Sequence, residues 1–223
     1  MKSFFDKSYL SYLVILGGSV LLLISFGIRH TSGLYLVPIS DHLQTGREIF
    51  GLAVAIQFLL IGIGSPLFGA LADKYGSGKA ALLGVFLVLI GLYWMAHVNS
   101  SFEIIASQAI FGLGAAGCGT AVVLGAVGKS VKEKNRTLSL GIVMAAGSLG
   151  QFLLVPLAGF LIQISDWSTS ILYLTLIAAI MLIFCFPLGY AGKTDTIEKD
   201  TGQSLKDALK LTNLFENYSI KDL

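Results

Sequence analysis

Six long stretches of the chain are almost entirely apolar, and short polar segments separate them. They run approximately over residues 10–37, 50–72, 80–96, 102–127, 138–164 and 170–190. About 20 residues of helix cross a bilayer core about 30 Å thick, and lipid offers no partner to exposed backbone polar groups. The pattern therefore predicts an all-α membrane protein with a bundle of six transmembrane helices over residues 1–192.

A polar tail, residues 193–223, follows the sixth stretch. Within it the segment from Ser204 to Phe215 alternates apolar and polar residues with helical spacing. This spacing predicts an amphipathic helix that begins with a serine cap.

The composition indicates a membrane environment. Of the 223 residues, 55% are hydrophobic and 13% are charged, and the mean hydropathy is +0.80. A soluble domain needs a more polar surface than this. The 26 glycines suit helices that pack closely in lipid. The net charge of +2 gives no indication of a nucleic-acid partner.

The basic residues are divided unequally between the two sets of connecting segments. Thirteen of the fifteen lie at the amino end, after the second and fourth stretches, and in the tail. Arg47 lies on the opposite side, and Arg29 lies inside the first stretch. Because short cytoplasmic segments retain positive charge, we expect both termini to be cytoplasmic and the protein to reside in the cell (inner) membrane.

The segment between the second and third stretches carries the most specific motif. It reads Gly69-Ala-Leu-Ala-Asp73-Lys74-Tyr-Gly76-Ser-Gly78-Lys79, and it resembles the loop signature G-x-x-x-D-[RK]-x-G-[RK]-[RK] of the major facilitator superfamily. Gly78 stands where the signature has the first of its paired basic residues. Gly69 suits close helix contact, and Gly76 suits a tight turn.

The resemblance implies that this loop braces two halves of a transporter in one conformation and releases them in another, with Asp73 in a gating role. Asp73 is suited to face a helix amino terminus, and Lys74 and Lys79 to lie near helix carboxyl ends or lipid phosphates. The alternative is a positive-inside loop whose aspartate caps a helix. Glu133 and Arg136 resemble the Glu–Arg pair that follows the fourth span of relatives.

Arg136 is then a candidate partner for Asp73, and the alternative is a solvated run of charges.

A short internal echo points to the same family. Residues 66–71 (PLFGAL) recur as residues 156–161 (PLAGFL) in the fifth stretch. The echo suggests a 3+3 inverted repeat, as found within each half of this superfamily, although chance is an equal alternative in so apolar a chain.

The segment from Ser25 to Tyr35 contains the charge that lies deepest in a predicted span. It resembles the first span of bacterial relatives of monocarboxylate transporters and of oxalate and formate exchangers. An arginine at a helix centre costs about 2.5–3.5 kcal/mol on insertion scales, so it usually faces a wet cavity or a partner. No Asp or Glu lies deep in a stretch, and we therefore expect Arg29 to balance an anionic substrate.

The alternative is that Arg29 and His30 reach the outer interface with their side chains. Further candidates for a cavity are polar residues of other stretches: Tyr35, Gln57, Gln108 and Gln151. Each can hydrogen-bond a solute, and each can equally link two helices. Gln108 occupies the position of the usual arginine of the fourth span, which removes the basis for proton coupling through that arginine.

Six spans match the amino-terminal half of a major facilitator transporter, and the tail resembles the loop that joins the two halves. The sequence therefore predicts a half or truncated secondary transporter that moves a small solute by alternating access, with a monocarboxylate or other organic anion as the candidate. Its expected partners are the bilayer and either a second six-helix half or a second copy. A non-transporting scaffold or inert fragment is the alternative. No enzyme chemistry, metal site or cofactor is predicted, because the three histidines lie near the outer face without a nucleophile or ligand set.

Overall fold

The computed structural model describes residues 2–191, and this part of the chain is helical apart from short connections. The predicted amphipathic helix of the tail lies outside the described residues. In chain order the helices are α1 (Lys2–His30), the 3₁₀ helix η1 (Ser32–Tyr35), α2 (Leu36–Leu43), α3 (Arg47–Tyr75), α4 (Ser77–Met95), α5 (Ser101–Gly117), α6 (Thr120–Ser130), α7 (Glu133–Ile164), α8 (Trp167–Ala179) and α9 (Met181–Leu188).

The described helices form six segments that are long and apolar enough to cross a membrane, which confirms the prediction of six spans. Four of the segments both begin and end within about three residues of the predicted limits. The first is longer than predicted, because η1 and α2 extend it to Leu43. The first, fourth and sixth segments are each built from more than one helix.

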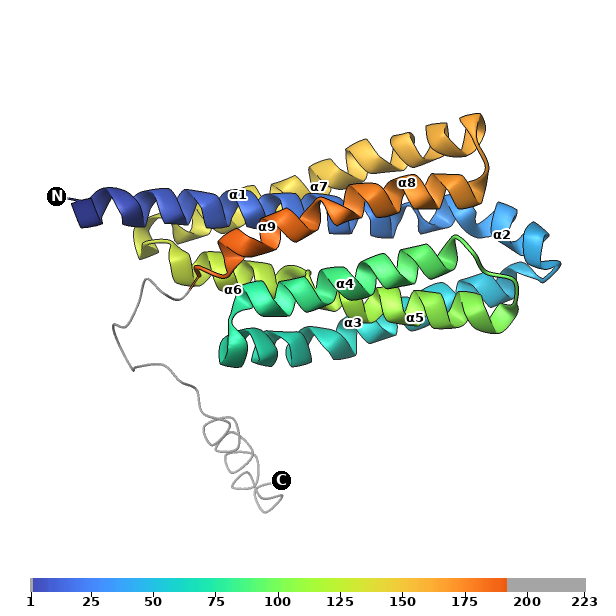
Figure 1. The fold of residues 1–223 in the computed structure, drawn as a ribbon, viewed down its shortest axis with the longest axis horizontal. Helices are drawn as coiled ribbons and strands as arrows, with labels where there is room; N and C mark the ends of the chain where they lie inside the picture. Colours follow the sequence, from blue (N-terminus) through green and yellow to red (C-terminus); the bar gives the residue numbers. More distant parts are fainter. Residues whose placement is uncertain (1, 192–223) are drawn as a thin grey trace, which may run out of the picture.

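The helices pack in two groups that lie side by side (Figure 1). In one group α1 runs along α7, and in the other α3 and α4 both run along α5. Glycines allow these contacts: a Cβ added to Gly84 of α4 would lie 2.6 Å from the carbonyl carbon of Gly117 of α5. Backbones that approach this closely gain dispersion contacts, which drive helix association in lipid.

Local signals explain where several helices begin. The Ser100 hydroxyl accepts a hydrogen bond from the backbone N–H of Glu103, and the Glu103 carboxylate accepts one from Asn99, as in a capping box. Asp166 caps α8 by accepting from the N–H of Thr169 at 3.1 Å. Between α3 and α4, Gly76 has a φ of +98°. This conformation favours glycine and allows the chain to reverse direction there.

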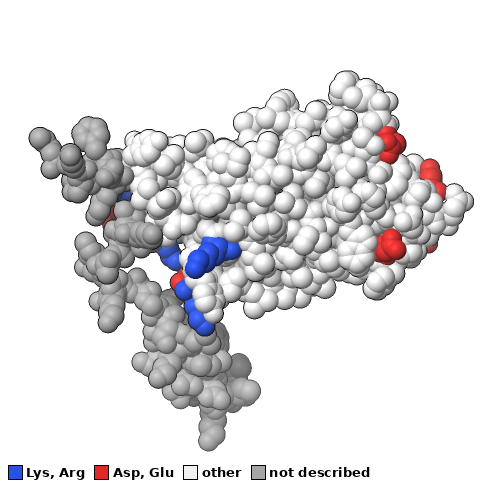
Figure 2. Space-filling model, viewed as in Figure 1, with Lys and Arg blue, Asp and Glu red and all other residues white. Residues whose placement is uncertain are grey.

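The charges of the described residues separate along the bundle. In Figure 2, lysines and arginines gather toward one end and most acidic side chains toward the other, with an uncharged band between them. The helix ends around the α3–α4 and α6–α7 connections supply the basic end. The helix ends on the opposite side carry Asp41, Glu48, Glu103 and Asp166. The uncharged band is the part of the surface suited to hydrocarbon.

Candidate functional site

Arg29 lies inside the first membrane segment, close to the end of α1. Its guanidinium carbon is 4.5 Å from the ring centroid of Phe26 and 5.7 Å from that of Phe58 in α3. Phe58 is about 16 Å along α3 from the first residue of that helix, Arg47, at 1.5 Å per residue. Along the bundle axis, the guanidinium therefore lies well inside the apolar band. The first membrane segment also continues beyond Arg29, to Leu43.

The side chain of Arg29 is partly buried, and its Nε has no hydrogen-bond partner among the described residues. Within the same part of the chain, no carboxylate forms a salt bridge with it. The rings of Phe26 and Phe58 offer it cation–π contact. This contact leaves the N–H donors of the guanidinium available to an anion.

Helix α1 ends next to this arginine, and nearby side chains bond to the freed carbonyl groups. The Thr31 hydroxyl donates to the carbonyl oxygen of Ile28 at 2.7 Å, and the Ser32 hydroxyl donates to that of Arg29 at 3.0 Å. The His30 side chain is exposed, with Nδ1 2.8 Å from the Phe26 carbonyl oxygen. These local bonds satisfy the backbone where the helix is interrupted.

A second interruption, between α5 and α6, lies against α1 beside Ser25, on the amino-terminal side of Arg29. The Cys118 thiol donates to the carbonyl oxygen of Gly114 at 3.3 Å and lies 3.7 Å from the Ser25 hydroxyl. Ser25 precedes Arg29 by about one helical turn. The first and fourth segments are thus both interrupted near the partly buried guanidinium of Arg29.

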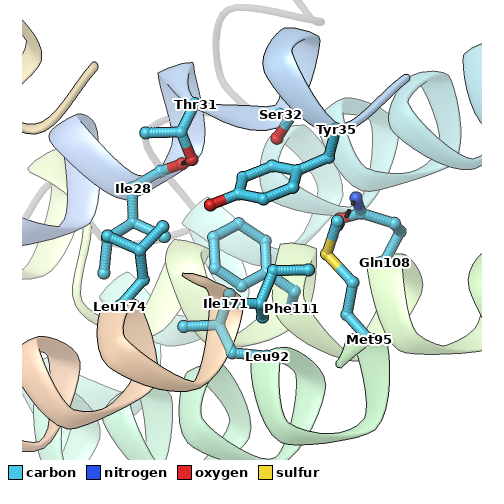
Figure 3. A pocket seen from close by; sticks show the side chains of 10 residues that line it. All are labelled: Ile28, Thr31, Ser32, Tyr35, Leu92, Met95, Gln108, Phe111, Ile171 and Leu174. Carbon is cyan, nitrogen blue, oxygen red and sulfur yellow. Dashed lines mark hydrogen bonds between the residues drawn. The ribbon is translucent and has the colours of Figure 1, made fainter. Parts of the chain in front are cut away.

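Tyr35 and Gln108 meet at a small cavity within the bundle (Figure 3). The Tyr35 hydroxyl lies 2.8 Å from the Ser170 hydroxyl, and the Gln108 amide donates to the sulfur of Met95 at 3.6 Å. Both side chains are almost completely buried. The cavity offers about 10 Å³ to the centre of a water molecule, which is room for about one water. In this conformation both residues link helices.

The other two predicted glutamines lie apart from that cavity. Gln57 is fully buried where α3 crosses α5, and its backbone lies against Gly112. Neither atom of its amide has a hydrogen-bond partner among the described residues. Gln151 of α7 is partly exposed. The structure therefore does not bring the predicted binding residues into a single group. Of the predicted glutamines, Gln57 is adjacent in sequence to Phe58, whose ring Arg29 contacts.

The loop motif makes a contact that the sequence does not single out. Asp73 pairs with Lys129 at the end of α6, at 2.5 Å, rather than with Arg136 or with a helix amino terminus as expected. Arg136 and Glu133 lie exposed in the first turn of α7. Lys129 begins the basic run that ends at Arg136, and this run was the available signal for an ion pair.

The packing role expected of Gly69 is not seen. Apart from the adjoining residues and the backbone of its own helix, a Cβ added there would have no described atom within 4 Å, because this face of α3 is not covered by another described helix. Gly76, by contrast, occupies the turn predicted for it. Lys74 lies with its ammonium 5.1 Å from the ring centroid of Tyr75, and Lys79 lies exposed in the first turn of α4.

Known proteins resemble this chain in sequence and in fold. Monocarboxylate transporter 11 of Mus musculus is 25% identical over 156 residues, which cover 68% of this chain and 34% of the relative. The oxalate:formate antiporter of Oxalobacter formigenes is 25% identical over 171 residues, which cover 75% of this chain and 40% of the relative. A crystal structure of the peptide transporter POT superposes with a TM-score of 0.70 at 18% identity, covering 95% of this chain and 48% of that one.

The chain thus spans between about a third and a half of the length of these proteins. The fold shared with the peptide transporter agrees with the six apolar segments and the helix packing described above. A family profile described as Major Facilitator Superfamily matches residues 16–217, which is most of the chain. This polypeptide is therefore a multi-pass membrane protein that belongs to the major facilitator superfamily.

Proposed function

We propose that the chain forms one six-helix wall of a secondary transporter for a small organic anion, acting by alternating access with a second six-helix half. The observation that carries this proposal is Arg29, a guanidinium in the apolar band with no carboxylate partner among the described residues. Two relatives whose names state a substrate, a monocarboxylate transporter and an oxalate:formate antiporter, support an organic anion.

The energetics favour an anionic ligand over a neutral one. A carboxylate would complete the charge-assisted hydrogen bonds that Phe26 and Phe58 do not supply. The same bonds are worth about 1.5–3 kcal/mol each when one partner is charged. Gln57, next in sequence to Phe58, is a candidate second contact because its amide is unpaired. Tyr35, Gln108 and Gln151 remain secondary candidates, together with His30.

A 3+3 inverted repeat suits alternating access, and two observations support it. The first and fourth segments, which hold the same place in each set of three, are both interrupted, and the sixth segment is interrupted as well. In the second and fifth segments, buried positions recur ninety residues apart: Ala53 with Val143, and Gly64 with Leu154. The same interval relates the two echoed PLxGxL sequences.

The basic end of the bundle is proposed to be cytoplasmic, in an inner membrane, with both termini on that side. There the Asp73–Lys129 pair, together with Lys74, Lys79, Glu133 and Arg136, forms the candidate gate. The uncovered face of α3 that includes Gly69 is the proposed contact with the second half. A different six-helix half is favoured over a second copy, because the cavity face would be expected to match a different partner.

Uptake into proteoliposomes tests the proposal. The chain is reconstituted alone and with a co-expressed six-helix half, and entry of radiolabelled lactate, formate and oxalate is measured. We expect Arg29→Gln to weaken substrate affinity roughly ten- to hundredfold, from about 1.5–3 kcal/mol for one charge-assisted bond. Arg47→Gln, which removes a charge at the outer end of α3, is the matched control and should transport normally.

Unchanged uptake in Arg29→Gln would contradict the anion site. If the folded protein transported none of these solutes in either arrangement, a non-transporting scaffold would be the better description. Transport of a neutral solute with no dependence on Arg29 would retain the transporter and reject the substrate class.

A further inference from the structure

A groove of about 170 Å³ lies between the start of α4 and the end of α9. These two helix ends lie near each other in Figure 1, toward the end of the bundle opposite α2. The contact is close, because a Cβ added to Gly78 would lie 2.5 Å from the backbone nitrogen of Gly189. A hollow lies beside this contact. Its lining residues are Gly78, Lys79 and Leu82 of α4 together with Cys185, Phe186 and Gly189.

The groove is apolar and lies at the surface of the bundle. The Phe186 side chain at its edge is 72% exposed. A closed apolar cavity of about 150 Å³ is known to take up benzene. The hollow is therefore large enough for a short stretch of hydrocarbon chain.

A positive charge lies at one edge of this apolar groove. Lys79 is exposed, and no described carboxylate pairs with it. It belongs to the first turn of α4, which contains no acidic residue and has no side-chain cap. The partial positive charge of the helix amino terminus adds to that of the ammonium. An anionic group is therefore favoured at this edge.

We propose that the groove between α4 and α9 binds one anionic phospholipid from the leaflet at the basic end of the bundle. The phosphate of the headgroup lies on Lys79, and part of one acyl chain lies in the hollow between Leu82 and Phe186. The pairing of an apolar groove with a cation selects this occupant. A soluble phosphate has nothing to place in the hollow, and a lipid without net charge gains less from the ammonium.

Native mass spectrometry of the full chain in detergent measures this binding directly, with phosphatidylglycerol and phosphatidylcholine of identical acyl chains as probes. We expect phosphatidylglycerol to bind more tightly to the unmodified protein. Lys79→Gln should weaken its binding about fivefold, the equivalent of about 1 kcal/mol for one lysine near an anionic surface. Lys74→Gln removes the same charge from the end of α3 and is the matched control; its effect should be less than twofold.

Filling the hollow provides a second test that changes no charge. Leu82→Trp should reduce binding of both lipids at this site, and Leu82→Phe serves the same purpose if the larger residue prevents folding. A correct fold is checked for each variant by its melting temperature. Binding that survives both Lys79→Gln and Leu82→Phe would overturn the proposal, as would equal affinity for the two lipids.

Displacement of phosphatidylglycerol by millimolar inorganic phosphate would also overturn the proposal, because it would reveal a simple anion site. A further test cross-links the cysteine of a Leu82→Cys variant to residues 192–223. A cross-link that excludes lipid from the groove would identify the chain itself as the occupant and reject the lipid. None of these measurements depends on transport. Failure of the lipid proposal is therefore distinguishable from failure of the proposed function.

Discussion

Replacing Gly150 with alanine adds one methyl group where the backbones of α1 and α7 touch. The new Cβ would overlap the carbonyl oxygen of Leu23 and lie 2.8 Å from its Cα. Both are backbone atoms, so no side-chain rotation relieves the clash. The two helices would have to separate, and the contact of Gly147 with Phe26 on the same interface would loosen with them.

The expected size follows from two opposing effects. Overpacking of a well-packed interior costs about 1–3 kcal/mol, and a backbone clash belongs at the upper end of that range. Alanine is better than glycine in a helix by about 1 kcal/mol. We therefore expect Gly150→Ala to lower the free energy of unfolding by about 2 kcal/mol. Gly141→Ala, on the same helix with no described atom within 4 Å, should be neutral or stabilising.

Thiol-reactive fluorescence during heating in detergent measures this difference. Cys118 and Cys185 are 0% and 3% exposed, so the dye reports unfolding without an added label. A difference of about 3 kcal/mol between the variants corresponds to roughly 6–12 °C in melting temperature for a chain of this length. Equal melting temperatures for Gly150→Ala and Gly141→Ala would refute the close approach of α1 and α7.

Three further predictions concern polar contacts. Asp73→Asn removes an exposed ion pair and should change stability by less than about 1 kcal/mol, so a large effect on uptake in that variant would come from gating. Tyr35→Phe leaves the buried Ser170 hydroxyl unpaired and should cost about 0.6–2 kcal/mol; the additional change Ser170→Ala should recover part of it, as read from melting temperatures. Hydrogen bonds from Thr169 lower the pKa of Asp166 below its ordinary 3.8. The ionised Asp166 side chain therefore stabilises α8 above about pH 4, and this stabilisation is lost as the pH falls through the lowered pKa. Asp166→Asn keeps a capping side chain without a titrating group, and its melting temperature should fall less than that of the unmodified protein between pH 6 and pH 3.

The sequence by itself determined the features that depend on local chemistry. Six spans were predictable because crossing a bilayer requires a fixed length of apolar helix. The turn at Gly76 was predictable because few other residues adopt its positive φ. The loop motif from Gly69 to Lys79 was sufficient to indicate the family, and the position of Arg29 inside a span could be read directly.

Tertiary structure alone decided which side chains meet. Lys129 became the partner of Asp73 because the ends of α3 and α6 come together, and nothing in the basic run distinguished it from Arg136. Tyr35 and Gln108 turned into the bundle, whereas Gly69 turned outward. A soluble helix marks its buried face with apolar residues, but a helix in lipid is apolar on every side. The sequence of such a helix therefore carries little information about its rotation around its own axis. Only packing against the neighbouring helices decides which face is buried in the bundle.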